Sequence, residues 1–115
     1  MGLGEQIAAR RALQRKQIEV VEWGESEDQP LILYCGPITA GDIDKLQRKH
    51  KDFLSNMTIT GMVDLIINKA EDADGKRLFT LEDKMYLMKE SVTLISDIAG
   101  KMFSDVDSVE DAEKN

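Results

Sequence analysis

Residues 58–69 read Thr-Ile-Thr-Gly-Met-Val-Asp-Leu-Ile-Ile-Asn-Lys. Six of these side chains are large and apolar, and at helical spacing they cover more than half of the helix circumference. A helix this apolar is either the central helix of a domain or one with a second buried face. We therefore expect a core built around this segment, with Leu65, Ile66 and Ile67 buried, together with Ile95 from a later helix.

Three more segments with helical spacing surround this one. Residues 39–55 open with Thr39 and Asp42, a pair that resembles a capping box, and then repeat apolar residues every three or four positions. Residues 80–88 open with the same Thr-x-x-Asp pattern, and residues 91–103 carry a further apolar stripe. The sequence therefore predicts about four helices.

Two short strands precede the helices. Residues 17–23 cluster β-branched residues with a tryptophan, and their alternation slips at Val20-Val21, which suits a bulge. Residues 31–35, Leu-Ile-Leu-Tyr-Cys, form an apolar run whose length favours a strand. Joined by a polar loop, the two strands predict an antiparallel hairpin. One face of it must pack on the helices, because a lone hairpin is marginal in water.

These elements predict a mainly α fold (α+β), with about four helices packed behind a short N-terminal two-stranded β-hairpin. We expect residues 17–103 to form a single globular domain and residues 1–16 a flexible or helical arm. Residues 104–115 contain five acids and one lysine, so we expect a disordered acidic C-terminal tail.

Charge and composition exclude several classes of function. The chain has 115 residues, with 22 acids against 15 bases and a net charge of −7. This balance argues against a general nucleic-acid binder and against an anionic membrane surface as the partner. No apolar run approaches the roughly 20 residues of a membrane span, and no secretory signal is visible. We expect a protein of a reducing, cytoplasmic compartment.

The residues that could carry chemistry are few. Cys35 is the single cysteine and His50 the single histidine, so a disulfide within the chain and a Cys/His zinc cluster are excluded. Asp72-Ala-Asp-Gly75 resembles part of a calcium-binding loop, but Ala70 and Leu81 occupy its two end positions, and an acidic turn is the better interpretation. We predict no catalytic residue, no cofactor and no metal site, and therefore no enzyme.

The methionines suggest a surface for another protein. Five of the six lie in the helical half of the chain. Methionine fills irregular cores and also lines adaptable binding grooves. Core filling is the default interpretation, but the excess favours a protein that holds an apolar helix. The candidate partner-binding residues are Met62, Met85 and Met88.

The order of these parts resembles the tail assembly chaperones of long-tailed bacteriophages with non-contractile tails (the siphovirus type). The resemblance covers about residues 15–103. It includes the strand end Glu22-Trp-Gly24, the turn at Thr39-Ala-Gly-Asp42, a charged helix and then a strongly apolar one. Its most specific part is residues 72–83, Asp-Ala-Asp-Gly-Lys-Arg-Leu-Phe-Thr-Leu-Glu-Asp, before the last helix opens at Lys89-Glu-Ser91.

The resemblance implies a non-enzymatic role in virion assembly. Chaperones of this family are made during phage assembly in the host cytoplasm, coat the aggregation-prone tape measure protein and help recruit tail tube subunits. They are absent from the finished virion. The resemblance, together with the apolar surface, leads us to expect a homo-oligomer, but it transfers no residue-level binding site. The alternative is a small non-catalytic adaptor or regulatory subunit of a bacterial protein complex.

The resemblance also raises the prospect of ribosomal frameshifting, because many members of the family are made in a longer form by a slip near the end of the gene. Glu113-Lys-Asn115 can be encoded by GAA AAA AAC, which contains the slippery heptamer A AAA AAC. The codons for residues 99–101 can contain a second slippery heptamer. Codon degeneracy leaves an ordinary acidic tail without recoding as the alternative.

Overall fold

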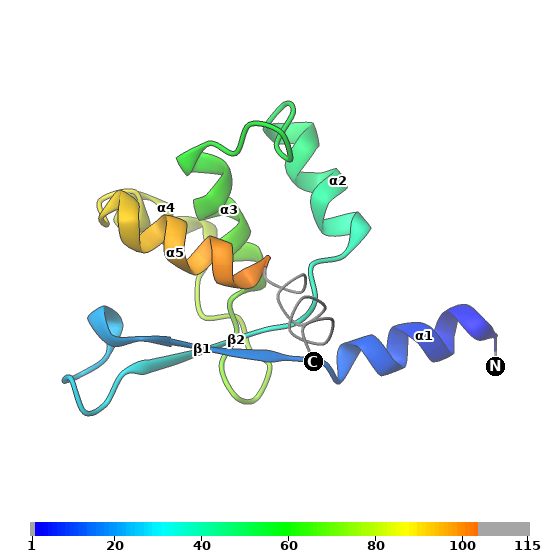
Figure 1. Cartoon of the computed structure of the whole chain (residues 1–115), viewed down its shortest axis with the longest axis horizontal. Helices are drawn as coiled ribbons and strands as arrows, with labels where there is room; N and C mark the ends of the chain where they lie inside the picture. The colour runs from blue at the N-terminus through cyan, green and yellow to red at the C-terminus, as the bar shows by residue number, and fades with distance from the viewer. Residues whose placement is uncertain (1, 104–115) are drawn as a thin grey trace, which may run out of the picture.

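The computed structural model describes residues 2–103, in which four helices lie over one face of a two-stranded sheet and a fifth helix extends from the end of that sheet (Figure 1). The predicted disordered tail, residues 104–115, lies outside the described residues. The helices are α1 (Leu3–Ala12), α2 (Ala40–Lys49), α3 (Ile59–Lys69), α4 (Lys84–Leu87) and α5 (Val92–Met102). The strands are β1 (Lys16–Val20) and β2 (Leu31–Cys35), and two 3-10 turns are η1 (Val21–Trp23) and η2 (Leu81–Asp83).

The mainly helical class with an N-terminal hairpin is confirmed, whereas the helix count is wrong: the described residues form five helices rather than four. The additional helix is α1, in the segment that was expected to be flexible or helical. Its residues are good helix formers, and Glu5 near its start and Arg10 and Arg11 near its end suit the helix dipole. Its apolar stripe is thin, however, and α1 buries no residue.

The hairpin is antiparallel, with Ile18 opposite Leu33 and Val20 opposite Leu31. The alternate residues Ile18, Val20, Leu33 and Cys35 are buried, so this face of the sheet meets the helices. The predicted strand over 17–23 is shorter than expected, because β1 ends at Val20 and the chain enters η1 instead of forming a bulge. The other edge of β2 is bridged at Tyr34 by the backbone of Glu71, which follows α3.

Three predicted helix starts are confirmed, whereas the helix predicted over residues 80–88 is divided into the 3-10 turn η2 and the short helix α4. Thr39 and Asp42 form a capping box at α2, and the hydroxyls of Thr58 and Ser91 accept hydrogen bonds from backbone N–H groups at the starts of α3 and α5. The predicted end of α2 near residue 55 is wrong, because α2 ends at Lys49.

The early end of α2 lets the chain turn back toward the core. The turn passes through Asp52, which has a positive φ of 58°. It inserts the fully buried Phe53 against Gly61 of α3. A Cβ atom at Gly61 would lie 2.6 Å from the Phe53 ring, so only glycine accommodates this approach.

Helix α3 is the central helix, packed against α2, α4 and α5. The predicted burial of Leu65, Ile66, Ile67 and Ile95 is confirmed. Ile59 and Met62, the remaining large apolar residues at its N-terminal end, are partly buried against the same core. The large apolar surface of α3 is therefore used mainly inside the domain.

Candidate docking surface

An apolar surface lies exposed on the segment that leads through η2 and α4 into α5. Leu81, Met85 and Met88 follow one another at spacings of four and three residues, which places them on one side of a helical segment. Leu81 is 69% exposed and Met85 60%, and Met88 is also exposed. Tyr86 and Val92, in the same stretch of sequence, are also exposed. We call these five residues the α4 surface.

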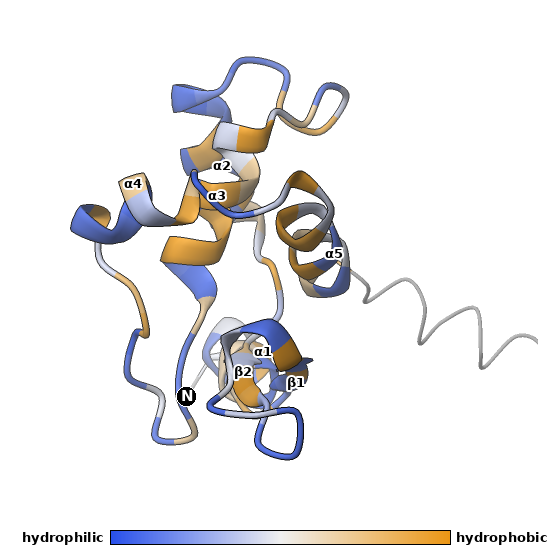
Figure 2. Ribbon diagram, turned by 90° about the vertical axis from the view of Figure 1, so that its left-hand side faces the viewer, coloured by the Kyte–Doolittle hydropathy of each residue, from blue (hydrophilic) through white to orange (hydrophobic). Residues whose placement is uncertain are grey.

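The α4 surface is held outward by contacts on the other sides of the same segment. Leu87 is buried in the core and fixes the opposite side of α4. At η2, the Asp83 carboxylate accepts a hydrogen bond from the Thr80 N–H at 2.8 Å. Just before η2, Phe79 packs edge-on against Trp23. Behind α4, the Trp23 indole donates a hydrogen bond to Glu90 at 2.9 Å. Figure 2 shows α4 at the edge of the helical layer, away from the sheet.

A buried acidic residue connects α4 to the centre of the domain. Asp64 of α3 is 4% exposed. Its carboxylate lies 2.6 Å from His50 Nε2 and 3.4 Å from Lys49 Nζ, both at the end of α2, and 2.9 Å from Lys84 Nζ of α4. We call these four residues the Asp64 cluster. It joins three helices through charge and hydrogen bonds, and it secures the first residue of α4.

Sequence reasoning identified His50 as the single histidine but did not find its partner Asp64. A signal was present, because Asp64 is the single acidic residue in segment 58–69 and stands between the apolar residues Val63 and Leu65. A charge at that place needs a partner when the helix is buried. The partners come from positions 14 or more residues away along the chain, which no local spacing reveals.

The Asp64 cluster predicts acid sensitivity. Burial raises the pKa of the Asp64 carboxyl, but the hydrogen bonds from His50 and Lys84 and the charges of Lys84 and Lys49 outweigh it, so the pKa lies below its ordinary value of 3.8. The folded state therefore holds this proton less tightly than the unfolded state. The stabilising effect of the ionised Asp64 carboxylate is complete above the pKa of the unfolded state and is lost as pH falls through the pKa of the folded state.

We expect the melting temperature to fall from about pH 4 downward, with a smaller fall in Asp64→Asn than in the wild type. Asp42, whose pKa is also below 3.8, contributes to the same fall and remains in the variant; burial raises its pKa, but hydrogen bonds from Thr39 and Lys69 and the Lys69 charge lower it further. Thermal unfolding followed by circular dichroism between pH 2 and pH 7 measures both curves. Equal slopes in wild type and variant would contradict the role given to Asp64.

The structure also places the other residues that were considered for chemistry, Cys35 and the acidic turn at Asp72. Cys35 is buried in the hairpin. The Asp72 carboxylate accepts hydrogen bonds from the Asp74 and Lys76 backbone N–H groups at 2.8 and 2.9 Å, which closes the acidic turn. Within residues 2–103, no group of three or more His, Cys, Asp or Glu side chains is placed to hold a metal ion. In the same part of the chain, no helix combines the length and apolar character of a membrane span.

The three candidate methionines occupy two different environments. Met85 and Met88 belong to the exposed α4 surface, whereas Met62 lies on α3, partly buried against the core. Sequence reasoning missed Leu81, Tyr86 and Val92 as surface residues. Leu81 has helical spacing with Met85 and Met88, and an apolar stripe at that spacing ordinarily faces the core.

Comparison with protein-family models, with curated proteins and with solved structures finds no match for this chain.

Proposed function

We propose that this protein is a phage tail assembly chaperone that binds the tape measure protein and helps recruit tail tube subunits during virion assembly. The observation that carries the proposal is the α4 surface, five exposed apolar residues within residues 81–92 of a small acidic domain. The resemblance in residues 15–103 supplies the identity of the partner. The burial of Cys35, and the backbone hydrogen bonds that the Asp72 carboxylate accepts, support the non-enzymatic part of the proposal.

The chemistry of the α4 surface suits an apolar helical partner. Leu81, Met85 and Met88 form a row about as long as two helical turns, which is the spacing at which an amphipathic helix presents its own anchors. Methionine side chains adapt to partners of different shape, which favours a chaperone that must bind many positions along one long protein. The net charge of −7 would keep such an assembly soluble.

The same proposal includes several copies on each partner and a location in the host cytoplasm rather than in the mature virion. Multiple weak contacts along a long chain raise the overall avidity without requiring a large surface on each copy. Five side chains are few for a stable single interface, so repeated binding is the arrangement that a surface of this size favours.

Co-expression with the tape measure protein encoded by a neighbouring gene tests the proposal. We expect that protein to be insoluble when expressed alone, and to become soluble and co-purify with this chain when the two are expressed together. If the tape measure protein stays insoluble, or if no tail genes lie beside this gene, the proposal fails. In that case the alternative of a small adaptor or regulatory subunit of a bacterial complex is favoured.

A further inference from the structure

A groove separates α1 from the body of the domain. It has a volume of about 840 Å³. Ala8, Ala12 and two arginines of the N-terminal arm form one wall, and residues 36–39 with Lys69 and Glu71 form the other. Since α1 buries no residue, the groove leaves a ten-residue helix supported only at its C-terminal end. Helices of this length are marginal in water without tertiary contacts.

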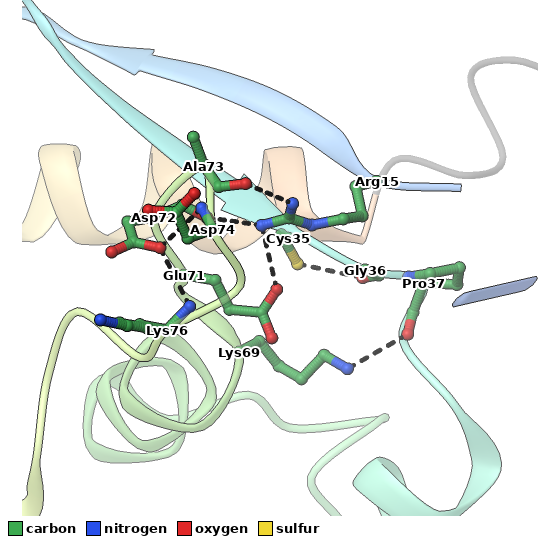
Figure 3. Close-up of polar contacts among 10 residues, drawn as sticks. All are labelled: Arg15, Cys35, Gly36, Pro37, Lys69, Glu71, Asp72, Ala73, Asp74 and Lys76. Atoms are coloured by element: carbon green, nitrogen blue, oxygen red, sulfur yellow. Dashed lines mark hydrogen bonds and ion pairs between the residues drawn. The ribbon is translucent and has the colours of Figure 1, made fainter. Parts of the chain in front are cut away.

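Two positive charges that line the groove, those of Arg15 and Lys69, are already paired. Arg15 forms an ion pair with Glu71 at 3.2 Å and donates to the carbonyl oxygens of Asp72 and Ala73 (Figure 3). Lys69 donates to the Pro37 carbonyl and pairs with Asp42 at 3.0 Å. These contacts pair the charges of Arg15 and Lys69 within the domain, so neither charge is left for a ligand.

The charges on α1 itself are different. Arg10 and Arg11 contact only uncharged groups within the described chain, namely the Gln6 carbonyl oxygen and the Gln14 side chain. Arg11 lines the groove, and both arginines lie beside the exposed Leu3 and Ile7 along a second hollow of α1. This helix therefore presents, next to apolar side chains, two cations that have no acidic partner among residues 2–103. An acidic segment that also carries apolar residues is the ligand that this combination fits.

We infer that α1 and its groove bind an acidic peptide segment, and that this segment is the chain's own residues 104–115. That segment carries five acids against one lysine, with Val106, Val109 and Ala112 between them. The binding pairs its carboxylates with Arg10 and Arg11 and covers the apolar residues of α1. It gives the arm the tertiary support that the described residues do not provide.

The starting point of the segment places it within reach. At the end of α5, the carbonyl oxygen of Met102 accepts a hydrogen bond from Lys16 Nζ at 2.8 Å, so α5 ends beside the first residue of β1, at the base of the arm. Twelve residues span up to about 40 Å when extended. Helix α1 is only about 15 Å long. Every position along the arm is therefore accessible to the segment from its own chain.

Hydrogen exchange of the α1 backbone amides in the full chain tests this inference. We expect residues 7–12 to exchange roughly tenfold more slowly in the wild type than in Arg10→Gln/Arg11→Gln, which keeps helix propensity but removes the charges. A second variant, in which the five acids of residues 104–115 become Asn or Gln, should accelerate exchange by the same factor. The matched control is Lys45→Gln/Lys51→Gln, which removes two exposed cations elsewhere and should leave α1 exchange unchanged.

The effect of dilution on this protection distinguishes a segment of the same chain from a second copy of the protein. Protection that is the same after tenfold dilution of the protein supports binding within one chain. Protection that falls on dilution overturns this assignment, because the occupant is then a second copy. The inference is also overturned if α1 exchanges equally fast in wild type and both variants, or if the arginine variant accelerates exchange while the neutralised acidic segment does not.

Discussion

Ile66→Asp is expected to abolish the folded state. Ile66 lies fully buried on α3, within the cluster of apolar side chains that forms the core. Burying a charged group without a partner costs several kcal/mol, while a domain of this size has a total stability of only about 5–15 kcal/mol. Circular dichroism should show no cooperative thermal transition, and amide NMR signals should collapse to the dispersion of an unfolded chain.

Leu54→Asp is the matched control for this substitution. Leu54 is a similar aliphatic residue that is 58% exposed in the turn after α2. Its replacement should change the free energy of unfolding by less than about 0.5 kcal/mol. A soluble Ile66→Asp protein with the wild-type melting temperature would show that α3 is not the centre of the core.

The second large effect is expected at the Asp64 cluster. Asp64→Ala leaves His50, Lys49 and Lys84 around an empty site, with their common partner removed. Breaking a buried ion pair by removing one partner costs about 3 kcal/mol or more. That corresponds to a fall in melting temperature of roughly 10–20 °C for a domain of this size. Thermal and urea unfolding at pH 7 measure the change.

Asp44→Ala provides the comparison. Asp44 also forms an ion pair, at 2.8 Å with Arg48, but both side chains are exposed on α2. Exposed pairs contribute about 0–1 kcal/mol, so this variant should remain close to the wild type. If the two aspartate variants lose equal stability, Asp64 does not organise the packing of α2, α3 and α4.

The parts of the fold that were predicted correctly depend on neighbours in the sequence. Three of the helices begin at Thr39, Thr58 and Ser91. Each of these hydroxyls accepts a hydrogen bond from the backbone N–H three residues later, so nearby residues alone determine the helix start. The burial of Ile66 follows in the same way from the apolar periodicity of its own helix.

The parts that were missed depend on residues far apart in the chain. Helix α2 ends early because Phe53 must reach Gly61, a packing demand that capping and periodicity do not express. The outward direction of the α4 surface follows from Leu87, Trp23 and Phe79, which anchor the other sides of that segment. A spacing of four and three residues identifies a common side of a helix, but only the tertiary contacts decide whether that side faces the core.

The central claim is that the α4 surface holds the apolar partner. Co-expression of the tape measure protein with Leu81→Ser/Met85→Ser tests it most directly, with Leu54→Ser as a control for a comparably exposed apolar residue outside this surface. Both substitution sites are exposed, so the variants should keep the wild-type melting temperature. We expect the amount of soluble, co-purifying tape measure protein to fall at least fivefold with the double variant and to stay at the wild-type level with Leu54→Ser. Equal recovery with wild type and the folded double variant would contradict the claim.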